Sequence, residues 1–144
     1  MPHVAVDALA AHLAAFPAAP DSLMFTLSGR PITRGLEHSA DVDHNFPHML
    51  MARGVFVDLD DVWNLVLACA VCNRGAGGKF HRLPHGDFLE SLWQRNERLI
   101  ASHHPLRESV ISATGVSAAA RLEFLRSMQT SATEHTRAEW RPPR

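Results

Sequence analysis

The stretch "DVDHNFPHML", residues 41–50, places a neighbouring acid and base, Asp43 and His44, directly beside apolar residues. Over residues 38–44, one set of side chains alternates with another: Ala40, Val42 and His44 with Ser39, Asp41 and Asp43. This alternation predicts a short β-strand, and Pro47 then ends it. Adjacent side chains on a regular strand point to opposite faces. For Asp43 and His44 to reach one reacting centre, the strand therefore has to end or bend where they lie.

A second strand and a short helix are predicted downstream, in "VWNLVLACAVCN", residues 62–73. Residues 65–68 are all apolar and suit a short buried strand. Residues 69–75 are able to open a helix, which the glycines at positions 75, 77 and 78 cut short. Residues 48–61, which include the acidic "DLDD", are expected to be irregular. The expected order is therefore strand, long connection, strand and helix.

Helical periodicity and turn residues predict the flanking elements. They are a helix over 4–16, a hairpin over 23–34, a long helix over 87–102, a shorter helix from His104-Pro105 to Gly115, and a last helix capped by Ser117. The expected fold class is α+β. The expected division is an N-terminal helix or arm (1–20), a central domain (21–115), and a C-terminal helix with a frayed, polar tail (116–144).

Charge, apolar runs and cysteine content indicate what the chain binds and in which compartment it works. The chain has 144 residues with 14 basic and 15 acidic side chains, so bulk positive charge does not drive binding to nucleic acid, although a local patch still can. No apolar run has the length of a membrane span, and no secretory signal is visible. The two cysteines form one C-x-x-C pair, which suggests a reducing compartment. We therefore expect a cytoplasmic protein that does not enter a membrane.

The acid and base have chemistry that suits metal-assisted hydrolysis. Asp43 offers a hard oxygen for Mg²⁺ or Mn²⁺, and a neutral imidazole at His44 can accept a proton from water near neutral pH. An Asp-His dipeptide alone is common. The C-x-x-C pair, Cys69 and Cys72, is compatible with half a zinc site, a redox pair or two buried small residues.

Taken together, "VDH" followed by "NLVLACAVCNRG" resembles the signature of the HNH nucleases, whose core is a ββα-metal finger. The resemblance covers residues 24 to about 115. It implies a small ββα-metal core with a preceding β-hairpin, flanked by N- and C-terminal helices. It also implies roles for single residues: His44 as general base, Asp43 and Asn73 as the ligands of one divalent metal, Mg²⁺ or Mn²⁺, and Asn64 as a brace for the long connection.

The activity implied by this resemblance is metal-dependent hydrolysis of DNA phosphodiester bonds, in a bacterial restriction or phage-defence setting. Because the net charge is near zero, we expect a partner module or protein, or a homodimer, to help bring the DNA. Asp41 either orients groups near the metal or is solvated. Basic side chains after the asparagine are expected to contact phosphate or else to be solvated: Arg74, Lys79, His81 and Arg82. Arg95 and Arg98 either extend this basic patch or pair with glutamates along their helix.

The chain departs from many relatives at the zinc knuckle. Met24 and Leu27 occupy the positions of the first C-x-x-C pair, and two thiolates cannot close a tetrahedral zinc site. We therefore expect no structural zinc, with Met24 and Leu27 packed against Cys69 and Cys72. Two other functions remain open: a catalytically silent HNH-fold module that binds nucleic acid or protein, and a C-x-x-C redox protein, which would need a thioredoxin-like βαβ context.

Overall fold

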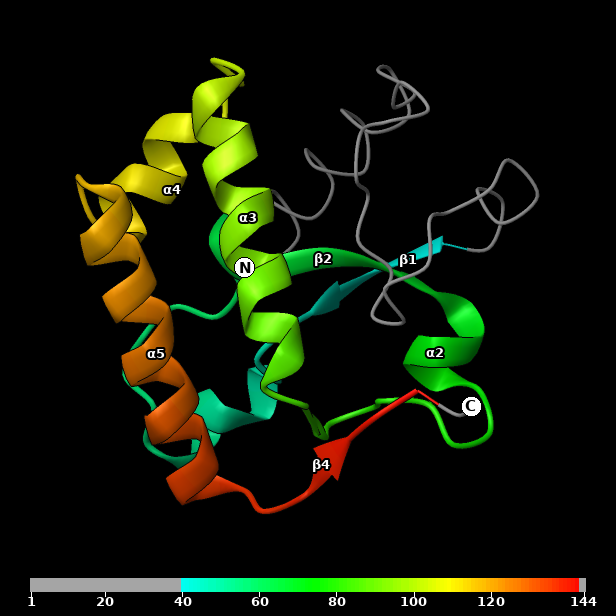
Figure 1. Cartoon of the computed structure of the whole chain (residues 1–144). Coiled ribbons are helices and arrows are strands. Elements are labelled where there is room, and N and C mark those ends of the chain that lie inside the picture. The colour runs from blue at the N-terminus through cyan, green and yellow to red at the C-terminus, as the bar shows by residue number, and fades with distance from the viewer. Residues whose placement is uncertain (1–39, 143–144) are drawn as a thin grey trace.

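The structure, a computed structural model, describes residues 40–142, with the side chains of Ala40 and Cys69 excepted. The expected helix over 4–16 and hairpin over 23–34 lie outside these residues, and so do Met24 and Leu27. Within the described part the chain is α+β, with two small sheets and several helices. Figure 1 shows α3, α4 and α5 on one side of the molecule, and β1, β2 and α2 on the other.

The predicted pair of strands and the short helix are present. Strand β1 (Ala40–His44) pairs antiparallel with β2 (Leu65–Cys69), so that Asp43 lies opposite Val66 and His44 opposite Leu65. Helix α2 (Ala70–Arg74) follows β2 without a break. This order places the end of β1 beside the start of β2 and the residues that follow α2.

The connection between β1 and β2, residues 45–64, is irregular but firmly packed. It contains two short 3₁₀ helices, η2 (His48–Arg53) and η3 (Val62–Asn64). Four of its large apolar side chains are fully buried: Phe46, Leu50, Leu59 and Trp63. The rings of Phe46 and Trp63 lie 5.9 Å apart, and Trp63 meets Phe124 of α5 edge to face at 4.9 Å. This connection therefore forms a large part of the core.

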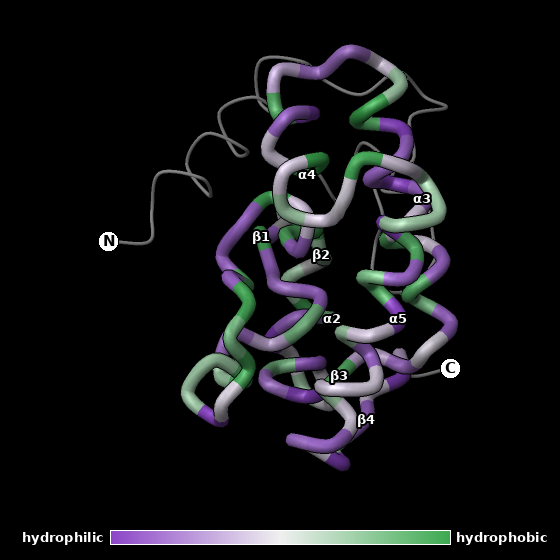
Figure 2. Tube along the Cα trace, turned by 90° about the vertical axis from the view of Figure 1, so that its left-hand side faces the viewer, coloured by the Kyte–Doolittle hydropathy of each residue, from purple (hydrophilic) through white to green (hydrophobic). Residues whose placement is uncertain are grey.

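Three helices cover the other side of this core: α3 (Asp87–Ala101), α4 (Arg107–Thr114) and α5 (Ala118–His135). All three match the periodicity in the sequence, and Figure 2 shows apolar and polar residues alternating along α3 and α5. Gly115 ends α4 with φ +129°, and the Ser117 hydroxyl accepts a hydrogen bond from the Ala120 amide, so the predicted cap of α5 is confirmed. Each helix contacts the other two.

The polar tail expected to be frayed within 116–144 is ordered in the part that the structure describes. Helix α5 continues to His135, and β4 (Glu139–Trp140) then pairs in parallel with β3 (Leu83–Pro84). Trp140 is buried, and its indole Nε1 donates to the carbonyl of Gly77 at 2.8 Å. One large aromatic side chain buries enough apolar area to fix a short polar segment. The end of the described chain is thereby attached to the loop after α2.

Among residues 40–142, no helix has the length and hydrophobicity that crossing a bilayer requires.

Candidate functional site

Several of the residues singled out in the sequence lie on β1 or contact it. His44 is the last residue of that strand, and Asp41 and Asp43 share one of its faces because side chains two positions apart do so. The two neighbours Asp43 and His44 take their partners from different segments. The partner of His44 comes from the connection 45–64, and the partner of Asp43 comes from the loop after α2.

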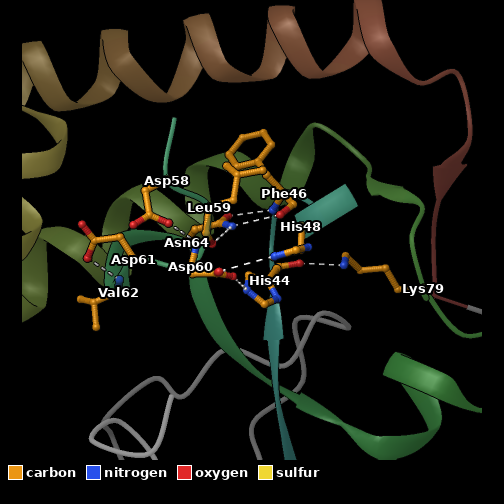
Figure 3. A network of polar contacts seen from close by, with 10 residues as sticks. All are labelled: His44, Phe46, His48, Asp58, Leu59, Asp60, Asp61, Val62, Asn64 and Lys79. Atoms are coloured by element: carbon orange, nitrogen blue, oxygen red, sulfur yellow. Dashed lines mark hydrogen bonds and ion pairs between the residues drawn. The ribbon is translucent and has the colours of Figure 1, made fainter. Parts of the chain in front are cut away.

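The imidazole of His44 is held by a carboxylate that the sequence interpretation did not select. His44 Nε2 lies 2.8 Å from Asp60 Oδ1, and both side chains are 24 % exposed. The second oxygen, Asp60 Oδ2, lies 3.5 Å from His48 Nε2. In Figure 3, dashed lines run from the Asp60 carboxylate to both imidazoles, whose ring centres are 5.7 Å apart. His44 therefore has a specific carboxylate partner.

Local hydrogen bonds fix the backbone around Asp60. The Asp60 amide donates to Asp58 Oδ1 at 2.9 Å, which is a turn typical of aspartate. One residue later, Asp61 caps η3, because its Oδ1 accepts from the Val62 amide at 2.6 Å. Burial is the main cause that raises the pKa of the Asp61 carboxyl, and this hydrogen bond opposes the rise. The acidic "DLDD" segment is therefore an ordered turn.

Asn64 ties the two ends of the connection together. Its Nδ2 donates to the carbonyls of Phe46 at 2.9 Å and Leu59 at 2.8 Å, and its Oδ1 accepts from the Phe46 amide at 2.8 Å. Its own carbonyl accepts from the Asn45 amide at 2.8 Å. Asn64 is fully buried, so these bonds satisfy polar groups that water does not reach. A brace for the long connection needs bonds of this kind.

Asp43 is paired with a buried ammonium group. Lys79 Nζ lies 3.0 Å from Asp43 Oδ2 and donates to the carbonyl of His44 at 2.7 Å. The side chain of Lys79 is 0 % exposed and that of Asp43 is 12 % exposed. Burial lowers the pKa of the Lys79 ammonium, and the Asp43 carboxylate offsets part of that change. This corrects the expectation that Lys79 is a solvated or phosphate-contacting charge.

Asn73 and Arg74 of α2 both contact Asp41. Asn73 Nδ2 donates to Asp41 Oδ2 at 3.2 Å, and the guanidinium of Arg74 reaches both Asp41 oxygens at 3.0 Å. Asp41 is thus engaged by α2 and is not simply solvated. The structure gives Asp43 and Asn73 different partners. They are linked through the backbone, because the amides of Lys79 and Phe80 donate to the carbonyls of Cys72 and Asn73.

The side chains at this face offer the hard oxygen donors that Mg²⁺ and Mn²⁺ prefer. Asn73 Nδ2 donates to Asp41, so Oδ1 is the atom of the same carboxamide that can act as an oxygen donor. Asp43 Oδ2 is paired with the Lys79 ammonium, so a cation that binds this carboxylate has to compete with Lys79. Among residues 40–142, no three His, Cys, Asp or Glu side chains gather in a way that alone would hold a metal. Of the two expected metal ligands, Asp43 and Asn73, only Asp43 belongs to these four residue types.

The other basic residues near the site differ in exposure and in their partners. Arg74 and His81 are exposed. The Arg82 guanidinium donates to loop carbonyls, at 2.8 Å for Gly77 and also at Gly78. It thereby holds the glycine-rich loop after α2 in a closed turn.

Arg95 belongs to the interior and not to a basic patch. Its guanidinium donates to the carbonyls of Val62 at 3.0 Å, Trp63 at 3.4 Å and Leu65. Burial lowers the pKa of Arg95 to about 10. The expectation that Arg95 contacts DNA or pairs with a glutamate on its helix is therefore wrong. Its role is to satisfy the backbone that leads from η3 into β2.

Sequence reasoning missed Asp60 and the inward orientation of Lys79. The signal for Asp60 was the run of three acids within "DLDD", but this run does not indicate which carboxylate reaches His44. Lys79 follows three glycines, and glycines permit too many backbone paths for a fold-back to be deduced. Cys72 is partly buried and packs against the core, while β1 and β2 are antiparallel, unlike the parallel βαβ context of a thioredoxin-like pair.

Comparisons of the chain with protein-family models, with curated proteins and with solved structures found no match.

Proposed function

We propose that this chain is a metal-dependent endonuclease of the HNH type that hydrolyses phosphodiester bonds in DNA. His44 acts as the general base, and Asp43 and Asn73 hold one divalent ion, Mg²⁺ or Mn²⁺. The observation that supports this most is the order β1, Asn64-braced connection, β2 and α2, in which α2 lies against β1 through the contact of Asn73 with Asp41, two residues before Asp43. The ββα-metal finger needs that arrangement.

The side chains divide the work in a way that fits hydrolysis of a phosphodiester. A bound divalent ion supplies charge neutralisation on the phosphoryl and leaving oxygens. His44 has one ring nitrogen on Asp60, so the other is available to accept the proton of an attacking water. Asp41 holds the Asn73 carboxamide by its Nδ2 and thereby orients Oδ1. Arg74 and His81 have exposed side chains, and in this proposal they contact phosphate from the solvent side.

The near-neutral net charge of this chain favours a partner in DNA binding. Arg82 and Arg95 donate to backbone carbonyls and Lys79 is buried, so few of the cations near the site face solvent. A partner module or protein, as in restriction or phage-defence systems, would supply the missing contacts. A homodimer would supply them from a second copy and also cut both strands.

The test is nicking of supercoiled plasmid in the presence of Mg²⁺ or Mn²⁺, with and without a chelator. The wild-type chain is expected to relax the plasmid, and His44→Ala to lose about 10²- to 10⁴-fold in rate, as expected for removal of a general base. His103→Ala is the matched control, because His103 is an exposed histidine at the distant junction of α3 and α4. It should nick at the wild-type rate.

Two results would contradict the proposal. If the wild-type chain nicks with neither metal, a catalytically silent binding module becomes the better account of the same fold. If His44→Ala nicks as fast as His103→Ala, another group is the base.

A further inference from the structure

We propose that Asp60 is a positioning residue that holds His44 in one tautomer, with the proton on Nε2 and the lone pair on Nδ1. This inference rests on the proposed function, in which the free nitrogen of His44 accepts a proton from water. Asp60 itself touches neither water nor phosphate in this account. It decides which nitrogen of the base is available and where that nitrogen points.

The distance and chemistry of the contact fix the tautomer. An ionised carboxylate only accepts hydrogen bonds, so a nitrogen that lies 2.8 Å from Asp60 Oδ1 has to be the donor. His44 Nε2 therefore bears a proton whenever Asp60 is charged. In a neutral imidazole the other nitrogen, Nδ1, is then the acceptor. Figure 3 shows the second ring nitrogen of His44 turned away from Asp60.

The Asp60 carboxylate is aimed at His44 by the backbone on both sides of it. Before it, the carbonyl of Leu59 accepts from Asn64 Nδ2 at 2.8 Å. At Asp60 itself, the amide donates to Asp58 Oδ1, and after it Asp61 caps η3. Four consecutive residues are thus held by local bonds, which is the support that a precisely placed partner requires.

One carboxamide sets the distance between Asp60 and His44. Asn64 bonds to both backbone groups of Phe46, two residues after His44, and to the carbonyl of Leu59, one residue before Asp60. The segments that bear the imidazole and the carboxylate are therefore fastened to the same buried side chain. The Asn64 brace thus has a further consequence: it keeps Asp60 within hydrogen-bonding distance of His44.

His48 makes a weaker contact with the same carboxylate. Its Nε2 lies 3.5 Å from Asp60 Oδ2, beyond the usual length of a hydrogen bond, and its side chain is 58 % exposed. We therefore assign the orientation of His44 to Asp60 alone. His48 serves as the internal comparison in the experiment, because it contacts the same carboxylate as His44 but at the longer distance.

The deciding experiment reads the tautomer of His44 directly. Long-range proton–nitrogen correlation NMR spectra of the whole chain, recorded well above the ordinary histidine pKa of about 6.5, are expected to show the Nε2–H form for His44. Asp60→Asn keeps the size of the side chain but offers an amide donor, so Nε2 is able to accept and the population of the Nδ1–H form should rise. Asp60→Glu keeps the acceptor and should retain the Nε2–H form.

Plasmid nicking by the same variants gives the second readout. Asp60→Asn should lower kcat by about 10- to 100-fold, the usual effect of losing a carboxylate that orients a histidine, with KM changed much less. Asp60→Glu should recover part of kcat, and His48→Ala should change it least of the three. Glu123→Gln, the same loss of one charge at an exposed position on α5, is the control and should behave as wild type.

The outcomes separate this inference from the proposed function. An Nδ1–H form in the wild type, or a tautomer unchanged in Asp60→Asn, overturns the inference whatever the nicking rates are. The same follows if Asp60→Asn and Glu123→Gln nick equally fast. If the wild type does not nick but its tautomer changes in Asp60→Asn, the proposed function fails and the hold of Asp60 on His44 stands. If Asp60→Asn does not fold, the wild-type spectrum and Asp60→Glu still decide.

Discussion

The two connections that meet at the end of β1 hold the site by different chemistry. Residues 45–64 are fastened by Asn64, a neutral carboxamide that both donates and accepts, and they bring a carboxylate to the side chain of His44. Residues 75–82 are fastened by two cations, Lys79 and Arg82, which are donors only: both donate to backbone carbonyls, and Lys79 also donates to the carboxylate of Asp43.

The first connection is therefore held by neutral hydrogen bonds, and the second by an ion pair. The Asn64 bonds involve no net charge, so a cation that binds nearby does not compete for them. The charge of Lys79 is balanced by the carboxylate of Asp43, and the two form a partly buried ion pair. Any cation that binds Asp43 therefore competes with Lys79. The first connection should determine the stability of the site, and the second should determine its affinity for metal.

The largest expected effect on stability comes from removing the neutral brace. Asn64→Ala leaves three backbone groups of Phe46 and Leu59 without partners in a region that water does not reach. We expect the free energy of unfolding to fall by about 4 kcal/mol, because each unsatisfied buried group costs about 1–3 kcal/mol. Urea denaturation followed by circular dichroism measures this change.

Asn96→Ala is the matched control for that prediction. Asn96 of α3 is also buried, and its Nδ2 donates one hydrogen bond, to the carbonyl of Trp63 at 3.1 Å. Both substitutions remove the same atoms and leave similar cavities, so the comparison isolates the hydrogen bonds. Asn64→Ala should be the more destabilising by ~2 kcal/mol or more. Equal losses would mean that Asn64 contributes by packing and not as a brace.

Removing the charged partner in the second connection should have two effects of opposite sense. Lys79→Met keeps an apolar stem but removes the ammonium from Asp43 and from the His44 carbonyl. Stability should fall by about 2 kcal/mol, because a partly buried carboxylate loses its partner. Affinity for Mn²⁺ should rise by roughly tenfold, equivalent to about 1.4 kcal/mol, because the ion no longer competes with the ammonium. Calorimetric titration with Mn²⁺ measures the affinity.

Arg82→Met tests whether that gain is specific to Asp43. It removes a cation from the same loop, but one that donates only to carbonyls, those of Gly77, Gly78 and Lys79. It should lower stability without raising Mn²⁺ affinity. If both variants bind Mn²⁺ as the wild type does, Asp43 is not a metal ligand, and the contrast between the two connections is lost.

Local patterns were sufficient for the elements around the site. Alternation predicts β1, an apolar run predicts β2, and the glycines after Arg74 predict a short α2; all three lie where expected. The Ser117 cap depends on a hydroxyl and an amide three residues away, so the sequence alone predicts it. These features have causes within a few residues of the chain.

The contacts that depend on distant segments were not predictable. Lys79 meets Asp43 from 36 residues away, and Arg95 meets the carbonyls of η3 from more than 30 residues away. A basic residue beside a suspected nuclease site suggests phosphate binding, and no local pattern distinguishes it from a buried donor. Trp140 likewise lies in a polar segment whose packing depends on the loop at Gly77. In each case tertiary structure supplies the partner.

The smallest expected effect concerns the turn that brings Lys79 beneath Asp43. Gly77 has φ +74°, and no atom lies within 4 Å of the position that a Cβ would take there, so only the backbone conformation opposes an added methyl group. Gly77→Ala should cost about 1 kcal/mol, the usual penalty for a side chain in the left-handed region. Gly77→Asn should cost less, because asparagine tolerates that region better. Urea denaturation of the two variants measures both costs.

Gly86→Ala provides the control, because Gly86 is equally open but has φ −54° at the start of α3. Alanine adopts that conformation without strain, so the substitution should be neutral or stabilise the fold by about 0.4–1 kcal/mol. Mn²⁺ affinity should remain unchanged in all three glycine variants, since Gly77 contributes only its carbonyl, to Trp140 and Arg82. A Gly77→Ala variant with altered Mn²⁺ affinity would instead mean that the shape of this loop, and not the charge of Lys79 alone, controls access to Asp43.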